Sequence, residues 1–244
     1  MHVVTSLTVA AGKRLIAKGV AAFPPVKRAL AQGTVAVGSG STNGYIIEEL
    51  TGEPFAKHSF VTGHTVPPDY RGPTIAYSVP DLVLRRGERM QLKAVDALKD
   101  MGPGDVFIKG ANALNYERQQ AGVLIGHPTG GNVGAVVGST VSRRILYLHP
   151  VGLEKCVSVD LEEVARRINR DPEGKGPTLW VVPGMIFTEI EALRTLVGIE
   201  ALPCGAGGIG GAEGAIWLAL FGDQSRLDQA LALLDTLKRE PPFC

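Results

Sequence analysis

The chain has few cysteines, almost no net charge and no long hydrophobic run. Its three cysteines, Cys156, Cys204 and Cys244, are an odd number and form no Cys-x-x-Cys pair. Disulfide frameworks and structural zinc sites use paired cysteines, so we expect neither, and the sequence is typical of a reducing, cytoplasmic environment. We expect no metal and no cofactor. Cys156 and Cys204 stand in apolar runs, which predicts buried, inert thiols.

Charge and hydropathy also exclude several partners. The 25 Lys and Arg residues nearly balance the 24 Asp and Glu residues, and the net charge is +1. A nucleic-acid-binding surface needs a continuous basic stripe, and the pairs at 85–86 and 143–144 do not build one. No window reaches about 18 uninterrupted apolar residues, and the N-terminal segment does not have the pattern of an export signal. We therefore expect neither nucleic acid nor a membrane as a partner.

Glycine, in contrast, is abundant, with 31 residues concentrated between β-like runs. Through residue 150, short β-branched runs alternate with segments of helical periodicity, a pattern typical of an α/β protein. We predict a Rossmann-like, mostly parallel sheet with helices on both faces over residues 1–170. A smaller ferredoxin-like α+β unit is predicted over residues 171–244, in the order strand, helix, strand, strand, helix. Such units often pack against a second copy, so we expect a homo-oligomer.

Local patterns predict several individual elements. The segment Phe55–Thr62 is predicted to be a strand, and Thr188 with Glu191 has the spacing of a capping box that opens a helix. A further helix, from about Val133 to Arg144, carries small residues four apart, at Gly134, Gly138 and Ser142. Each interior glycine destabilises a helix by about 1 kcal/mol relative to alanine, so we expect this face to pack tightly against another backbone.

The most informative motif is residues 34–43, Thr-Val-Ala-Val-Gly-Ser-Gly-Ser-Thr-Asn. The run Thr34–Val37 predicts a buried strand, glycines then turn the chain, and a helix is predicted next. Free backbone N–H groups and the positive end of a helix dipole meet at such a corner and favour a phosphate or a carboxylate. The expected ligand-binding residues are Gly38, Ser39, Gly40, Ser41, Thr42 and Asn43.

This corner matches neither nucleotide-binding pattern. The Walker pattern is absent, and Gly-x-Gly-x-x-Gly fails because its third glycine position holds Asn43. The motif therefore favours a small anionic ligand over ATP or a dinucleotide. The alternative interpretation is an ordinary strand-to-helix turn that uses glycine and serine for geometry and capping.

Two more corners follow predicted strands. Asp105–Lys109 leads into Gly110–Asn115, and Val123–Ile125 leads into His127–Asn132. Ligands of parallel sheets bind outside the carboxyl ends of the strands, so we expect all three corners to converge on one anionic small molecule. The additional ligand-binding candidates are Asn112, Thr129, Gly130, Gly131 and Asn132. For the two asparagines the alternative is a role in fixing turns or capping helices.

These corners resemble those of ribose-5-phosphate isomerases, a superfamily that includes glucosamine-6-phosphate deaminases, CoA transferases and sugar-phosphate-sensing regulators. Val-Gly-Ser-Gly-Ser-Thr before a helix is similar to their phosphate loop, and Asp105–Asn112 to a later strand and corner. The glycine-rich turn at 130–134 and the segment Arg143–Leu148 are similar to their next helix and strand. The likeness covers residues 10–150. It implies a Rossmann-like sheet and phosphate-binding hydroxyls at Ser39, Ser41 and Thr42.

The family's catalytic positions are not matched. Its acidic corner, Asp-Gly-Ala-Asp-Glu, reads Lys-Gly-Ala-Asn-Ala from Lys109 onward, its lysine-bearing glycine turn aligns with His127–Gly131, and Val136–Ser139 holds no general-base glutamate. An aldose–ketose isomerase needs a base and an electrophile at the developing oxyanion. Lys109 is the candidate electrophile and His127 the candidate base of an altered site. The alternatives are an exposed strand-end lysine and a loop histidine bonded to backbone.

Three functions stay open. The first is an isomerase-like enzyme acting on a phosphorylated sugar, and the second is a non-catalytic sugar-phosphate-binding or sensing protein, which the lost acidic corner favours. The third is CoA-ester transfer, for which Glu154 is the nearest glutamate. The cluster Gly205–Gly214, in which Glu213 is the sole ionisable residue, is either a loop that closes over the ligand or a flexible connection between strands.

Overall fold

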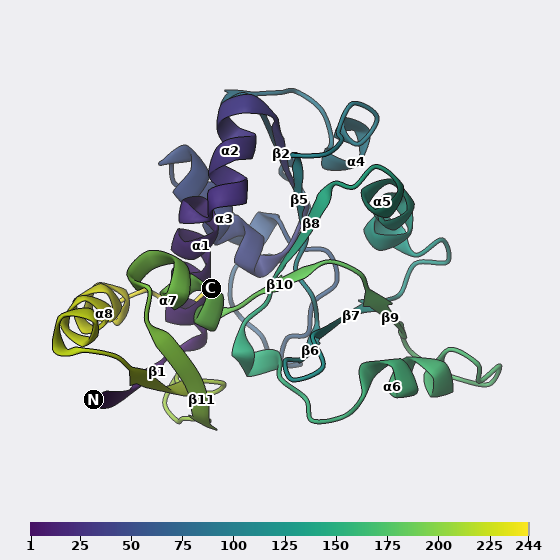
Figure 1. The fold of residues 1–244 in the computed structure, drawn as a ribbon. Coiled ribbons are helices and arrows are strands. Elements are labelled where there is room, and N and C mark those ends of the chain that lie inside the picture. The colour runs from purple at the N-terminus through teal and green to yellow at the C-terminus, as the bar shows by residue number, and fades with distance from the viewer. Residues whose placement is uncertain (244) are drawn as a thin grey trace.

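A six-stranded central sheet organises the chain, as the computed structural model of residues 1–243 shows (Figure 1). Its order is β10-β8-β5-β2-β3-β4. The first four of these strands are parallel, and β3 and β4 are antiparallel additions at one edge. The mixed α/β class with a mostly parallel central sheet is therefore confirmed. The strands are β2 (Thr34–Val37), β3 (Leu82–Arg85), β4 (Glu88–Arg89), β5 (Val106–Ile108), β8 (Leu146–Pro150) and β10 (Met185–Phe187).

Both faces of this sheet are covered, which explains why its strands are continuous apolar runs. Every residue of β2 and β5 is buried. Val35 and Ile108 belong to one core and Ala36 and Phe107 to another, because alternate side chains point to opposite faces. The first core includes residues of α1 (Val9–Ala22), α2 (Pro24–Gln32) and α3 (Ser41–Thr51), and the second includes residues of α4 (Ala94–Ala97) and α5 (Gly131–Ser142).

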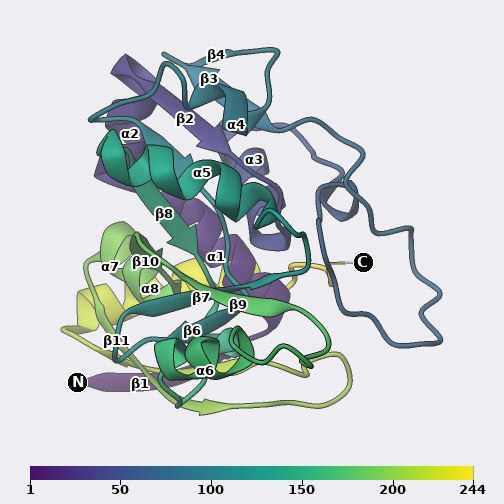
Figure 2. The same cartoon turned by 90° about the vertical axis from the view of Figure 1, so that its right-hand side faces the viewer.

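Two three-stranded antiparallel sheets accompany the central one (Figure 2). The sheet β6-β7-β9 packs against α6 (Leu161–Ile168) through a small cluster of Leu161, Ala165 and Leu179. The other sheet has the order β1-β12-β11 and lies beside α7 (Glu189–Val197) and α8 (Gln224–Leu237). Within residues 1–243, no helix is long and apolar enough to cross a bilayer. The strands are β1 (His2–Leu7), β6 (Ala113–Asn115), β7 (Gln120–Ile125), β9 (Thr178–Val182), β11 (Glu200–Ala206) and β12 (Ile216–Phe221).

The ferredoxin-like unit predicted for residues 171–244 is not present as a sheet of its own. The predicted strand Thr178–Val182 is β9, which pairs with β7, and β10 joins the central sheet beside β8. The strands β11 and β12 pair with each other, and β12 also pairs with the N-terminal strand β1. The prediction is wrong because strand partners far apart in the chain, such as β1 with β12 and β7 with β9, leave no local pattern in the sequence.

Two local predictions also need correction. In place of a strand over Phe55–Thr62, the structure has a 3-10 helix, η1 (Lys57–Ser59), and a single bridge between Phe60 and Tyr77. Cys156 and Cys204 are exposed, not buried. Cys204 lies where the pairing of β11 with β12 shifts register, at the edge of its sheet. An apolar run on an edge strand still has one open face.

The small-residue face of α5 packs against another backbone only at its N-terminal end, where a Cβ on Gly134 would meet the backbone carbonyl of Thr129. Gly134, Gly138 and Ser142 are all exposed, and a Cβ added at Gly138 would meet nothing within 4 Å. Close helix approach occurs elsewhere, at α1, where a Cβ on Gly19 would lie 2.6 Å from Cα of Ala192 in α7. Periodicity therefore identified a small face but not the surface that covers it.

Candidate anion-binding site

Loops at one edge of the central sheet surround a cavity of about 740 Å³. The loops that follow β2, β5 and β8 contribute Gly40–Asn43, Lys109–Asn112 and Lys155 respectively, as expected for the carboxyl ends of parallel strands. The third predicted corner, His127–Asn132, leaves β7 of a smaller sheet and still reaches the cavity. The predicted convergence of three corners is thus present in the structure.

Not every predicted ligand-binding residue lines this cavity. Gly38, Ser39 and Thr129 are outside the lining. The Ser39 side chain is fully buried and its hydroxyl lies 2.8 Å from that of Thr62. The residues that do line the cavity are Gly40, Ser41, Thr42, Asn43, Lys109, Asn112, His127, Gly130, Gly131 and Asn132.

The N-terminus of α3 presents unpaired amides to the cavity. Its first turn holds Ser41, Thr42 and Asn43, and within residues 1–243 no acceptor is bonded to their backbone N–H groups. The amides of Gly38 and Gly40 are different, because they donate to carbonyls of Ile108 (3.0 Å) and Phe60 (2.9 Å). These two amides are therefore not available to a ligand, whereas the first turn of the helix is.

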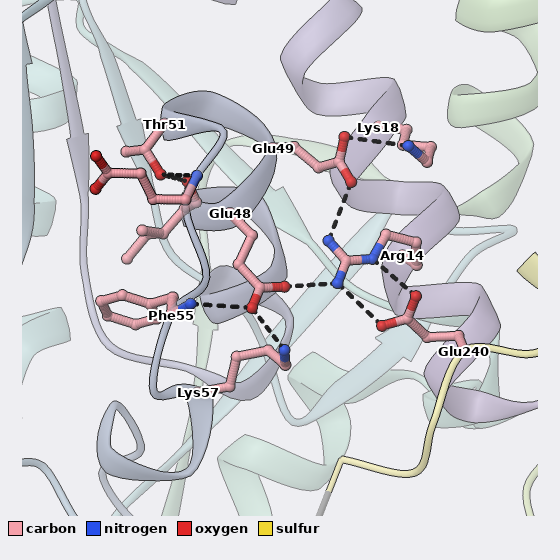
Figure 3. Close-up of polar contacts among 10 residues, drawn as sticks. Arg14, Lys18, Glu48, Glu49, Thr51, Phe55, Lys57 and Glu240 are labelled. Atoms are coloured by element: carbon pink, nitrogen blue, oxygen red, sulfur yellow. Dashed lines mark hydrogen bonds and ion pairs between the residues drawn. The ribbon is translucent and has the colours of Figure 1, made fainter.

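Ion pairs fix the other end of α3 (Figure 3). The Arg14 guanidinium of α1 bonds to Glu48 (2.5 Å) and Glu49 (3.0 Å) of α3 and to Glu240 (2.9 Å) near the C-terminus. Lys57 adds a 2.7 Å contact to Glu48. Burial of the Glu48 carboxyl opposes its ionisation, but the bonds from Lys57 and Arg14 outweigh burial and lower its pKa. Helix α3 is thereby held by charge at one end, while its amide end opens on the cavity.

A second helix N-terminus faces the same cavity. Helix α5 begins at Gly131 after Gly130, whose φ of 79° is in the left-handed region that favours glycine. A Cβ there would lie 3.0 Å from Cζ3 of Trp180. Gly134 closes the first turn by donating to the Gly130 carbonyl, and among the described residues no acceptor bonds the amides of Gly131 and Asn132. The dipoles of two helices therefore make the electrostatic potential of this cavity more positive.

Two lysines add positive charge. Lys109 Nζ donates to the Ser39 carbonyl at 3.0 Å, and Lys155 Nζ donates to the Ala111 carbonyl at 2.8 Å. In the part of the chain that the structure describes, neither ammonium forms an ion pair, and the cavity lining contains no Asp or Glu. Burial and the nearby charge of Lys155 lower the pKa of Lys109 to about 8, against a smaller opposite effect of Asp81. The lysine charges are left for an external anion.

Lys155 is not among the ligand-binding residues predicted from the sequence, although the sequence contains a pattern that could have identified it. It lies in the loop after β8, the next parallel strand, and the rule that selected Lys109 selects it once that loop is counted as a further corner. His64 and its neighbours Thr62 and Thr65 also line the cavity. They come from a segment with little regular structure, whose composition alone predicts only a loop.

Buried groups behind the cavity hold its loops in place. His149, at the end of β8, has its Nδ1 2.7 Å from the Lys109 carbonyl, and burial lowers the pKa of this ring. Glu189 Oε2 accepts from the backbone N–H of Leu153 at 3.0 Å, in the loop that carries Lys155. Burial and the neighbouring Glu154 raise the pKa of Glu189 to about 8. Both groups position the lysine-bearing loops from outside the cavity.

No family model, no curated protein and no solved structure matches the chain. The geometry of the cavity therefore carries the argument for function. Its volume is in the range of small-molecule sites, about 300–1,000 Å³. Among residues 1–243, no three His, Cys, Asp or Glu side chains gather as a metal-binding group.

The remaining candidates have more peripheral places. His127 is exposed at the rim, with Nδ1 3.0 Å from the Thr129 hydroxyl. Asn112 Oδ1 accepts from the Leu124 amide at 3.1 Å, and Asn132 Nδ2 lies 3.5 Å from Ser39 Oγ, so both asparagines tie loops together.

The glutamate and the glycine cluster considered as further functional elements lie outside the cavity. Glu154 is not among its lining residues. The cluster Gly205–Gly214 connects β11 with β12 and contributes no residue to the lining, and Glu213 accepts from the Gly211 amide at 2.9 Å. The position of Gly205–Gly214 therefore fits the interpretation as a connection between strands better than that as a loop over the ligand.

Proposed function

We propose that the chain binds a phosphorylated small metabolite in this cavity, at the carboxyl edge of a Rossmann-like sheet. One observation carries the proposal: two helix N-termini and two lysines without carboxylate partners face a lining that has no Asp or Glu. An unpaired ammonium in such a place is destabilised until an anion binds, and a phosphate accepts several N–H bonds at once.

A sugar phosphate is the ligand class that the lining favours. Hydroxyl and amide side chains at Thr42, Thr62, Thr65 and Asn132 lie around the lysines and offer donors and acceptors for sugar hydroxyls. The resemblance of the β2 corner to the phosphate loop of ribose-5-phosphate isomerases supports the same class. This resemblance is part of the proposal and does not by itself establish an isomerase.

The lining favours binding or sensing over isomerisation by an acidic base. It has no carboxylate, and His127 is held at the exposed rim by its contact with Thr129. Transfer chemistry through Glu154 is disfavoured, because that side chain is outside the lining. A reaction in this cavity would have to use its lysines or its histidines, His64 and His127.

Phosphate binding has a direct test by thermal shift. We expect inorganic phosphate and sugar phosphates to raise Tm in proportion to RT ln(1 + [L]/Kd), whereas the corresponding free sugars do not. Lys155→Met removes one charge-assisted bond, which is worth about 1.5–3 kcal/mol, and should weaken phosphate binding at least about tenfold.

Lys27→Met is the matched control, because Lys27 is an exposed lysine of α2 outside the cavity. Its phosphate affinity should equal that of the unmodified protein. Equal loss in both variants, or stabilisation by free sugars as strong as by their phosphates, would contradict the proposal.

A further inference from the structure

Lys109 occupies the centre of the site. It follows β5, which lies between β2 and β8 in the central sheet, and it lines the cavity. A single carbonyl, that of Ser39 at 3.0 Å, accepts from its Nζ. A neutral amine can keep that one N–H bond and still direct its lone pair at a ligand, because the bond to Ser39 uses one donor only.

The surroundings of Lys109 make its neutral amine more accessible than that of an ordinary lysine. Burial and the charge of Lys155, which lines the same cavity, lower the pKa of Lys109 to about 8, and Asp81 opposes them. The other titratable side chains near it are His64 and His127 in the lining and His149, which contacts the Lys109 carbonyl. A desolvated lysine beside a second cation is the arrangement that activates an amine as a nucleophile.

We propose that Lys109 forms an imine with an aldehyde or ketone carbon of the phosphorylated ligand. This inference rests on the proposed function, since the bound phosphate is what places the carbonyl at the amine. The helix N-termini and Lys155 then hold the anion, and Lys109 is the reacting group. The ligand class is narrowed to phosphorylated carbonyl compounds.

The step balances without an oxidant or a reductant. The Nζ lone pair forms a bond to the carbonyl carbon, and the carbonyl π electrons move to oxygen, which takes up the proton lost by nitrogen. The resulting hydroxyl takes a proton from solvent and leaves as water, and a C=N bond to Lys109 remains as the iminium. One amine, one carbonyl and one proton thus give one iminium and one water.

Reductive trapping with pyridoxal 5′-phosphate and sodium borohydride tests this step, because the probe carries an aldehyde and a phosphate on one molecule. Peptide mapping by mass spectrometry then locates the modified lysine. At limiting probe, we expect Lys109 to be labelled at least tenfold more than exposed Lys27. Pyridoxal, which lacks the phosphate, should label Lys109 far less, and inorganic phosphate should compete with labelling by the phosphorylated probe.

The pH dependence and two variants sharpen the test. Labelling of Lys109 should rise as pH increases through about 8, where its amine loses the proton. Lys155→Met removes the neighbouring charge and should move that midpoint to higher pH. Lys109→Arg removes the primary amine and should lose the label at this position.

The outcomes separate this inference from the proposed function. Phosphate stabilisation with no preference for Lys109 in the unmodified protein would overturn the imine and leave the binding function standing. Equal labelling of Lys109 by both probes, with no effect of phosphate on labelling or on Tm, would overturn both, because the amine would then react without an anion site. Since both readings use the unmodified protein, neither depends on how well a variant folds.

Discussion

Replacing Gly19 by alanine is expected to lower the free energy of unfolding by about 1–3 kcal/mol, although alanine is the better helix former. A Cβ at this position of α1 would lie 2.6 Å from both Cα and Cβ of Ala192 in α7 and 3.0 Å from Cε1 of Phe187. Backbone atoms cannot rotate out of the way, so the two helices must separate and lose contact along their length. Urea denaturation followed by circular dichroism measures the loss.

Gly138→Ala is the matched control, with the opposite expected sign. Gly138 lies inside α5, is exposed, and has nothing within 4 Å of an added Cβ. Helix propensity alone then acts, and the free energy of unfolding should rise by about 1 kcal/mol. A gain in stability from both substitutions would show that close packing of α1 on α7 does not govern Gly19.

The second large effect is expected for Arg14→Met, which should lower the free energy of unfolding by about 3 kcal/mol near pH 7. The substitution leaves the carboxylates of Glu48, Glu49 and Glu240 near one another without the shared guanidinium, with side chains only 14–20% exposed. It also removes the guanidinium from the face of Tyr45, whose ring centroid lies 4.8 Å from the Arg14 Cζ. Chemical denaturation at fixed salt is the measurement.

Lys99→Met provides the comparison for a solvent-exposed ion pair. Its partner Asp96 lies 3.7 Å away, and the two side chains are 79% and 52% exposed. Such pairs contribute about 0–1 kcal/mol, so little change is expected. Similar losses in the two variants would mean that the enclosure of Arg14 among three carboxylates does not determine its contribution.

Lowering the pH should reduce the contribution of the same ion-pair cluster to the free energy of unfolding. Burial opposes ionisation of Glu48, yet the bonds from Lys57 and Arg14 hold its folded-state pKa below the ordinary 4.5. This contribution to stability is present above the unfolded-state pKa and is lost as pH falls through the folded-state value. In Arg14→Met the folded-state pKa lies higher, so the free energy of unfolding should fall less steeply below pH 4.5 than in the unmodified protein. Parallel pH profiles of the two proteins would contradict this assignment.

Local signals were sufficient where a residue's neighbours in the chain determine its structure. The β-branched run at Thr34–Val37 is a fully buried strand, and the Thr188–Glu191 capping box is formed at the start of α7. Partners distant in sequence could not be found in this way. His2–Leu7 contains the β-branched residues Val3, Val4 and Thr5, but no local pattern reveals that its partner is β12. The helix face that contains Gly138 shows the same limit, because periodicity identifies the face but not the surface that covers it.

The same distinction applies to the candidate site, part of which could be predicted from the sequence and part of which could not. The convergence of the corners at Ser41 and Lys109 follows from the parallel direction of β2 and β5, so the sequence was enough to predict it. Gly130 reaches the same cavity from β7 of an antiparallel sheet, a placement that this rule does not explain. Which amides are free was not predictable, because Gly38 and Gly40 are occupied by carbonyls from β5 and from the segment around Phe60. Lys155 was overlooked because the loop after β8 has no glycine-rich corner to mark it.

The pairing of β1 with β12 has a consequence for how the chain is made. The register places His2 opposite Phe221, so β1 pairs with a strand that is synthesised more than 200 residues after it. Closing so large a loop is slow, and β1 stays unpaired until β12 has been made. Until then its apolar residues are a surface on which a chaperone can act.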